Sequence, residues 1–417
     1  MRGGAGIFYD RVGGDRFVHA AEAGDPYAQV VNYGPVNTQS NQTPWPVLSL
    51  GFTPRWFDPS SGLGSDLTNA GLDPHIHTPL LRQYSLGIQY EFAPHWVLEL
   101  GYVGSSGINL VDAYHDYNAA RLASAANPID GQITNTLENL NSRVPYLGYI
   151  PSGLTITAFD GKSNYNSLQA AVRKHLSHGL SLQASYTWSK NLSDLLNNAG
   201  SFNGNVNDPN KLSQQVGPVS FSRPQRLIVN YSWDPPLGKH RGPSGKVLEG
   251  WNLSGVTTIQ VGAPLTVTDS LAGSIYGMNG AYASTQTAQM CPGVTYPSAA
   301  TSGGIDSRLG GVSGGPGYLK LSAFCAPPAV GDGTGFGNSG IGILPGPGQA
   351  NFDVAAIKNT PIQEKQNLQF RAEFFNLFNH PQFGNPAVEV SSPGTFGQIT
   401  TTVVNPRIVQ FALKYIY

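Results

Sequence analysis

Two short segments of this sequence have the residue types and spacing of catalytic or nucleotide-binding motifs. Residues 311–315 match the G-x-S-x-G pattern, in which a sharp turn presents a nucleophilic serine, and Asp353 and His380 follow in the order of a hydrolase triad. Residues 333–337 resemble part of a glycine-rich dinucleotide loop. The first motif requires a strand before the serine and a helix after it, and the second requires a strand–helix–strand unit. Both lie in glycine-rich sequence without that context, so we predict no catalytic and no cofactor-binding residues.

Metal binding and disulfide formation are the other chemistry that the sequence offers. His75 and His77 would face the same way on a strand, but no acidic or cysteine partner is clustered with them, so we predict no metal site. Cys291 and Cys325 lie in one long glycine-rich stretch. In an oxidising compartment they could close a loop as a disulfide, and the alternative is two unpaired thiols.

The composition narrows the class of protein. Only 12% of the 417 residues are charged, 10% are aromatic, and there are 51 glycines and 31 prolines. Soluble domains carry about 25% charged residues. The net charge of −1 gives no reason to expect a nucleic-acid partner. No stretch approaches the roughly 18 consecutive apolar residues of a membrane helix, so a membrane protein of this sequence has to be a barrel.

Alternation of apolar and polar residues is the main structural signal. In 83–92, for example, Tyr84, Leu86 and Ile88 fall on one face and Ser85 and Gly87 on the other. We predict strands of this kind at 3–9, 83–92, 96–103, 167–176, 180–189, 227–233, 251–261, 350–358, 368–374 and 409–417. A soluble sandwich would give the same alternation, with its apolar face inside.

Two features favour a membrane barrel over a sandwich. Aromatic residues concentrate at strand ends, as interfacial girdles do, and the main examples are Trp96, Tyr102, Trp188, Trp233 and Trp251. The connections also alternate in length: those near 93–95, 177–179, 234–249 and 359–366 are the shorter ones, and those near 10–80, 105–163, 190–224, 262–350 and 379–405 are long. The sequence therefore predicts an all-β, antiparallel transmembrane barrel portion of about ten strands, with short periplasmic turns and long extracellular loops.

The first residues, Met1–Gly4, do not form a secretion signal. We therefore expect the sequence to begin inside a longer protein, with residues 1–417 forming the C-terminal part of a barrel and with signal peptide and plug domain absent. Additional strands would complete the barrel, or the ten strands would close on themselves as a smaller one, because an open sheet edge is not stable in lipid.

Residues 374–386 contain the sequence Phe-Asn-Leu-Phe-Asn, and residues 405–415 form the last alternating run. The first segment resembles one near the end of TonB-dependent receptors, and the second is similar to their last strand. The resemblance is closest to the Oar-like branch of these receptors, which bears a carboxypeptidase-regulatory domain. Residues 165–169, 186–190 and 250–255 add to the similarity, which covers nearly the whole chain. The resemblance implies a 22-stranded barrel that holds an N-terminal plug, with a TonB-contacting box before it. The plug, the box and the first strands are missing from this sequence.

The resemblance also implies partners and a function. The C-terminal run with Phe411, Leu413, Tyr415 and Tyr417 matches the signal by which the outer-membrane insertion machinery recognises such barrels. We expect a receptor or transporter in the bacterial outer membrane that takes up an unknown solute, with TonB acting only through the missing plug and box. The alternatives are a secreted glycan-binding module and a structural surface barrel without transport. Polar residues expected to face the lumen, which could contact a plug or solute or form internal salt bridges, are Glu91, Glu99, Arg173, Arg371 and Glu373.

Overall fold

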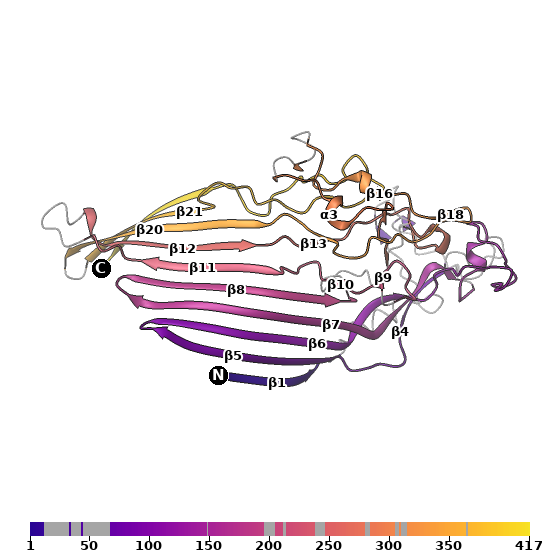
Figure 1. The fold of residues 1–417 in the computed structure, drawn as a ribbon, viewed down its shortest axis with the longest axis horizontal. Helices are drawn as coiled ribbons and strands as arrows, with labels where there is room; N and C mark the ends of the chain where they lie inside the picture. The colour runs from indigo at the N-terminus through magenta and orange to yellow at the C-terminus, as the bar shows by residue number, and fades with distance from the viewer. Residues whose placement is uncertain are drawn as a thin grey trace.

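The structure, a computed structural model, is dominated by one large antiparallel sheet (Figure 1). The residues it describes are 1–11, 33–34, 43–44, 67–147, 149–195, 205–211, 214–237, 247–279, 284–304, 308–309, 315–363 and 366–417. The strands of the sheet follow one another in chain order along a path of β1, β5, β6, β7, β8, β11, β12, β20, β21 and β22. This meander of antiparallel neighbours is the arrangement that the predicted strands required.

The strands of the path have the following bounds: β1 Arg2–Tyr9, β5 Leu80–Ala93, β6 Trp96–Asp116, β7 Tyr149–Ser177, β8 Leu180–Ser193, β11 Gln225–Trp233, β12 Trp251–Gln260, β20 Gln349–Gln363, β21 Gln366–Phe375 and β22 Ile408–Ile416. Two further strands join the sheet, β4 (Leu67–Leu72) beside β7 and β10 (Gly217–Pro218) beside β8.

The remaining elements are short and lie in the connections. They are β2 Tyr33–Gly34, β3 Thr43–Pro44, η2 Leu140–Ser142, β9 Asn205–Val206, β13 Pro264–Leu265, η4 Ser274–Tyr276, β14 Ser284–Thr285, β15 Gln289–Met290, α3 Tyr296–Ala299, η6 Leu321–Ala323, β16 Phe324–Cys325, β17 Ala329–Val330, β18 Gly333–Thr334 and β19 Leu344–Pro345. Within the described ranges, no helix is long and apolar enough to cross a membrane.

Short and long connections lie at opposite ends of the sheet, as Figure 1 shows. At one end, which we call the turn side, β7 and β8 are joined by His178 and Gly179 alone, both with positive φ (53° and 75°). Two residues of this kind form a hairpin turn whose twist matches that of its strands, so the turn also sets the register. The opposite end, the loop side, carries the long connections, and both chain termini lie toward the turn side (Figure 1).

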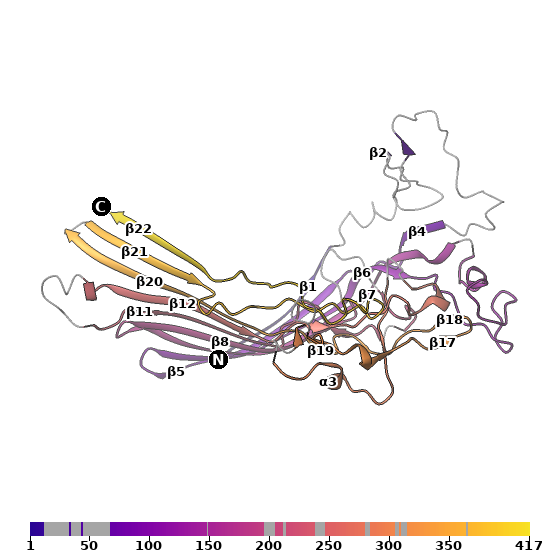
Figure 2. The ribbon, with the colours of Figure 1, turned by 90° about the horizontal axis from the view of Figure 1, so that it is seen from above.

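The sheet is curved and its path is open. Seen from above, β20–β22 rise away from the plane of β5–β8 (Figure 2). In the part of the chain that the structure describes, β1 pairs only with β5 and β22 only with β21, so each leaves one edge unpaired.

The register places all apolar residues of the alternating pattern on one face, which we call the outer face. One row across it runs through Leu86, Tyr102, Leu168 and Trp188 on successive strands. These side chains are not covered by protein: Ile88 is 50% exposed, Leu168 48% and Phe411 66%. A sandwich would bury this face in its core, so the exposed apolar side chains are those of a membrane barrel.

The hydrophobic core of the molecule lies in the long loops. Apolar side chains from two connections, the one between β12 and β20 and the one between β21 and β22, pack together there, and the buried members are Leu265, Val267, Ala288, Met290, Ala299, Tyr318, Leu319, Ala323, Phe324, Leu344, Phe396 and Ile399. We call this body the loop assembly; in Figure 1 it lies beyond the loop-side ends of β11, β12 and β20. The loops therefore form a packed structure of their own.

Some strands extend further than predicted. β6 continues to Asp116 and β7 begins at Tyr149, so the predicted loop over 105–163 is reduced to 117–148. A membrane strand needs about 9–11 residues. Asp116 lies 20 residues beyond Trp96, roughly 65 Å along an extended strand, and is therefore outside any bilayer. β20 likewise continues to Gln363 and β21 begins at Gln366, so strand covers most of the segment 359–366 that was predicted as a turn.

Candidate functional site

The face of the sheet opposite the apolar one, the inner face, carries the candidate site. Because side chains alternate along a strand, every second residue of β5–β8 points there, and these are mostly Gln, Ser, Thr, Glu, Arg and Gly. One row of this face runs from Gln89 through Glu99 and Ala171 to Ser185. The same strands thus present lipid-compatible and water-compatible surfaces on opposite sides.

A groove of about 580 Å³ lies over β1, β5, β6, β7 and β8. Part of its floor is bare backbone, because Gly4, Gly87 and Gly101 have no side chains to fill the space above them. A Cβ added at any of these three positions would meet no atom closer than 3.8 Å, so the space is open. Arg2 and Glu99 also line it. The result is an open depression of mixed polar and apolar lining, with charged groups on its walls.

Four charges of this face form two ion pairs. Arg173 Nη1 lies 3.6 Å from Glu99 Oε1, and farther along the sheet Arg371 Nη2 lies 2.7 Å from Glu373 Oε1. Both arginines keep more than two fifths of their side-chain surface exposed. Such pairs are held weakly in water, so the arginines remain available to an anionic group of a solute or of another protein segment. Glu91, also predicted to face the lumen, accepts a hydrogen bond from the His95 amide at 3.1 Å.

Hydrogen bonds join the polar side chains of the inner face into short chains. Gln169 Nε2 donates to Ser167 Oγ at 3.3 Å, and Gln369 Nε2 donates to Asn359 Oδ1 at 2.9 Å. Amides and hydroxyls both donate and accept, so this surface can solvate a polar solute without a fixed charge requirement.

The aromatic residues expected at membrane interfaces lie on the outer face at two levels. Trp96, Trp233 and Trp251 begin or end their strands at the turn side, where Lys174 Nζ lies 5.9 Å from the centre of the Trp96 ring. Tyr102 and Trp188 share a row nearer the loop side. Trp96 and Tyr102 are six residues apart on β6, roughly 20 Å, close to the ~25 Å apolar band of membrane barrels.

The C-terminal residues expected to form an assembly signal also lie on the outer face. Phe411, Leu413 and Tyr415 alternate on β22, all exposed, and Tyr417 follows the strand. The Phe411 ring stacks at 6.1 Å on Phe370 of β21. β22 is an edge strand, so these side chains and one row of backbone groups are accessible together.

Of the groups in the order of a hydrolase triad, the structure describes Asp353 and His380. Residues 311–314 lie outside the described residues. Asp353 Oδ1 accepts the Asn376 amide at 2.8 Å, and His380 Nδ1 lies 2.9 Å from Gln382 Nε2. Gly333 begins β18, which forms a small hairpin with β17, and this is not the strand–helix–strand context of a dinucleotide loop.

The two histidines that would face the same way on a strand, His75 and His77, both lie at the surface. His75 Nδ1 lies 3.3 Å from Asp73 Oδ1 on the surface, and His77 is exposed. In the described portion of the chain, no three His, Cys, Asp or Glu side chains are grouped so that they could hold a metal ion.

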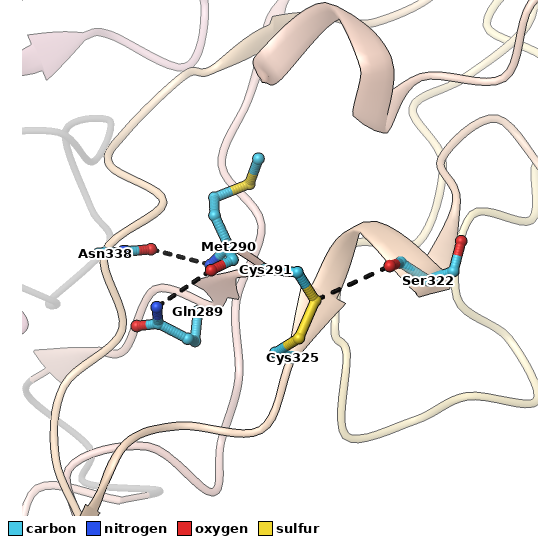
Figure 3. The surroundings of a disulfide bond; sticks show 6 residues. All are labelled: Gln289, Met290, Cys291, Ser322, Cys325 and Asn338. Carbon is cyan, nitrogen blue, oxygen red and sulfur yellow. Dashed lines mark hydrogen bonds between the residues drawn. A yellow bond between two sulfur atoms is a disulfide. The ribbon is translucent and has the colours of Figure 1, made fainter. Parts of the chain in front are cut away.

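Cys291 and Cys325 are joined by a disulfide in the loop assembly, across β15 and β16 (Figure 3). Met290, next to Cys291, is anchored by its backbone amide, which donates to Asn338 Oδ1 at 2.8 Å. The bond closes 34 residues of chain and sits beside the core residues Phe324 and Met290. The disulfide therefore holds together β15 and β16, which do not pair with the large sheet.

Two buried charged residues were not identified from the sequence. Arg143 is fully buried and donates hydrogen bonds to several backbone carbonyls, although arginine is normally a surface residue. Asp116 is 1% exposed at the end of β6. Neither lies in a recognisable motif, and only the path of the chain buries them.

Residues 1–410 match the protein family described as "Outer membrane beta barrel domain". The chain belongs to this family. It is therefore an outer-membrane protein of the β-barrel class, which decides between the membrane and sandwich interpretations of the alternating strands in favour of the membrane. No curated protein sequence matches the chain significantly.

Solved structures similar to this outer membrane beta barrel domain include three outer-membrane proteins. The transporter YddB of Escherichia coli is 11% identical with a TM-score of 0.36, covering 84% of this chain and 34% of its own. The pyoverdine receptor FpvA of Pseudomonas aeruginosa PAO1 is 12% identical with a TM-score of 0.38, covering 83% of this chain and 31% of its own. BauA, the ferric preacinetobactin receptor of Acinetobacter baumannii, is 10% identical with a TM-score of 0.37, covering 85% of this chain and 32% of its own. The chain spans about a third of the length of these proteins.

Proposed function

We propose that this chain is the C-terminal part of the barrel of an outer-membrane receptor that takes up a solute by TonB-dependent transport. The observation that carries the proposal is the opposition of two faces on the same strands. Leu86 and Ile88 are exposed on the outer face of β5, while Gln89, between Ile88 and Tyr90, points into the polar inner face. A wall between lipid and an aqueous passage needs this arrangement.

The polar inner face supports transport better than a purely structural role. Its groove combines open glycine positions with the partly exposed Arg173 and Glu99, which can exchange partners with a passing solute or a plug. The segments that resemble TonB-dependent receptors, such as 374–386, lie on β21 and the connection after it.

Further strands would complete the barrel at the free edges of β1 and β22. Unpaired backbone amides and carbonyls in hydrocarbon cost several kcal/mol each, so the open sheet is stable in a membrane only when both edges are paired. We place those strands, a plug and a TonB-contacting box in a longer protein that contains this chain. Assembly would begin at β22, whose exposed Phe411, Leu413 and Tyr415 suit recognition by the outer-membrane insertion machinery.

The first test is membrane assembly. The full chain, expressed behind an outer-membrane signal with and without the in-frame coding sequence upstream of Met1, is fractionated and run on a gel before and after heating. We expect the longer product in outer membranes, with migration that changes on heating because a closed barrel resists detergent. A soluble product without a heat shift would contradict the barrel.

The second test addresses energy coupling separately. The longer product and residues 1–417 alone are each mixed with the purified periplasmic domain of TonB. Binding by the longer product only is expected, since the contact box would precede the plug. An assembled barrel that never binds TonB would leave a structural surface barrel as the better description.

A further inference from the structure

The outer face of β5–β8 changes character toward the loop side. From the turn side up to the row of Tyr102 and Trp188 this face is aliphatic and aromatic. The next two rows toward the loop side are mainly polar. One row runs from Tyr84 through Gly104 and Asn166 to Lys190, and the other from Arg82 through Ser106 and Asn164 to Leu192. In a membrane barrel this is the level at which hydrocarbon gives way to lipid headgroups.

Two cations mark this polar rim. Lys190 and Arg82 are both exposed, and neither forms an ion pair with any residue that the structure describes. They lie three strands and one row apart, roughly 15 Å. The outer-face positions between them on β6 and β7 hold Ser106, Gly104, Asn164 and Asn166, with no carboxylate.

A hydrogen-bonded network stiffens the surface between the cations. The hydroxyls of Tyr84 and Tyr102 both donate to Asn166 Oδ1, at 3.2 and 2.6 Å, and Asn166 Nδ2 donates to Asn164. The two tyrosine rings stack with centroids 6.2 Å apart. Asn166 lies directly opposite Lys190 in the register. The neutral part of the rim is thus ordered before any ligand arrives.

An apolar groove of about 540 Å³ opens directly beside Lys190. The groove exists because β8 changes its partner strand along its length. Trp188 is opposite Gln225 of β11, whereas Leu192 is opposite Pro218 of β10. Residues 219–224, which connect β10 to β11, are not part of a strand. The side chains that line the groove include Leu168, Trp188, Leu192, Pro218 and Pro224. The lining residues include Lys190 and Asn166 of the polar rim as well as Leu168 and Trp188 of the apolar band.

We propose that this rim is a specific site for a membrane lipid with a phosphate headgroup. The phosphate lies between Lys190 and Arg82, and one acyl chain fills the groove beside Trp188. Charge complementarity supports this occupant, because two cations without a counter-charge face the headgroup level. Continuity supports it as well, because the groove opens onto the surface that already contacts lipid in the outer-membrane barrel. The inference does not depend on transport through the barrel.

Native mass spectrometry of the full chain in a neutral detergent tests the site. Dioleoylphosphatidic acid and dioleoylglycerol are the probes, since they share acyl chains and differ by the phosphate. We expect phosphatidic acid to be retained more tightly, by about tenfold for each charge-assisted contact. The double variant Lys190→Gln/Arg82→Gln should bind the two lipids equally, whereas Lys190→Arg should keep the preference.

The matched control removes the same charge from the other face. Arg226 and Lys414 lie on the inner face, Arg226 opposite Thr187, so Arg226→Gln/Lys414→Gln should keep the preference for phosphatidic acid. Circular dichroism checks that both double variants fold alike. If the rim variant kept the preference, or the control lost it equally, general charge attraction would explain binding and the site would be refuted. Equal retention of both lipids by the unmodified chain would refute headgroup recognition.

Discussion

Arg143 Nη2 donates a hydrogen bond to the carbonyl oxygen of Ile275 at 2.9 Å, across 132 residues of sequence. The same guanidinium donates from Nη1 to the Arg121 carbonyl at 2.5 Å and from Nε to Asn139 Oδ1 at 2.7 Å. A buried cation is normally paired with an anion, but here backbone carbonyls supply the acceptors. One side chain thereby joins the loop after β6 to the loop after β12.

The first prediction concerns this junction. Lysine at position 143 has three donors on one nitrogen and cannot reach acceptors spread around a planar guanidinium, so buried carbonyls would lose their partners. Arg143→Lys should destabilise the loop assembly by about 3 kcal/mol. Limited proteolysis within 117–148 measures the effect. Arg121→Lys, an exposed position of the same loop, should cleave like the parent chain; equal cleavage of both variants would refute the role of Arg143.

The second prediction concerns the disulfide between Cys291 and Cys325. Because it closes 34 residues, the chain-entropy argument gives roughly 4 kcal/mol of stabilisation. Cys291→Ser/Cys325→Ser should raise amide exchange in β15 and β16 without changing exchange in β5–β8. Reductant should reproduce the effect in the parent chain and do nothing to the variant. Unchanged exchange around residues 289–325 after reduction would contradict it.

The third prediction concerns how stability depends on pH through Asp116, at the loop-side end of β6. Burial raises the pKa of Asp116 to about 6, although the Asn118 amide hydrogen bond and the charge of His115 lower it. The folded state therefore holds this proton more tightly than the unfolded state, whose pKa is near 3.8. The protonated Asp116 therefore stabilises the folded state fully below pH 3.8, and this stabilisation is lost as the pH rises through 6.

Asp116→Asn imitates the protonated carboxyl and keeps an oxygen to accept the Asn118 amide. Above pH 6 the variant should be more stable than the parent by about 2–3 kcal/mol, and near pH 4 the two should be alike. Thermal melting followed between pH 4 and 8 gives the comparison. Asp130→Asn, an exposed position of the same loop, should produce no such trend. A constant difference at every pH would rule out titration of Asp116 as its source.

The fourth prediction compares the two faces of β5. Ile88 is 50% exposed in the middle of the apolar band, so Ile88→Arg should cost about 2–4 kcal/mol in a bilayer. Gln89→Arg places the same charge on the inner face, opposite Glu99, and should be tolerated. Urea unfolding of the membrane-assembled protein measures both. Greater damage from Gln89→Arg would reverse the assignment of the faces.

The strands were predictable where a local rule acts on consecutive residues. The β7–β8 hairpin follows from Ser177-His178-Gly179 between two alternating runs, and the structure turns there. The extension of β6 to Asp116 was not predictable, because alternation fails after Gly107. There the β6–β7 register shifts three times, between Gly107 and His115, so no period of two marks the strand.

The candidate site was predictable in part. Inner-face residues such as Glu99 and Arg173 follow from the alternation, because the period of two assigns each residue to a face. Their separation of 3.6 Å follows only from the register of β6 on β7. Apart from its two cysteines, the loop assembly gave no signal, since Val267 and Phe396, which share its core, lie far apart in sequence without any period.

By itself, then, the sequence determined a two-faced antiparallel sheet with turns at one end and long loops at the other. Side-chain alternation and turn geometry act over a few residues and can be read directly. The tertiary structure alone decided that the loops pack into a body, that Arg143 joins the loop after β6 to the loop after β12, and that Lys190 stands beside an apolar groove. Those relationships join residues far apart in the chain, and their free energies depend on burial and register, which no local pattern encodes.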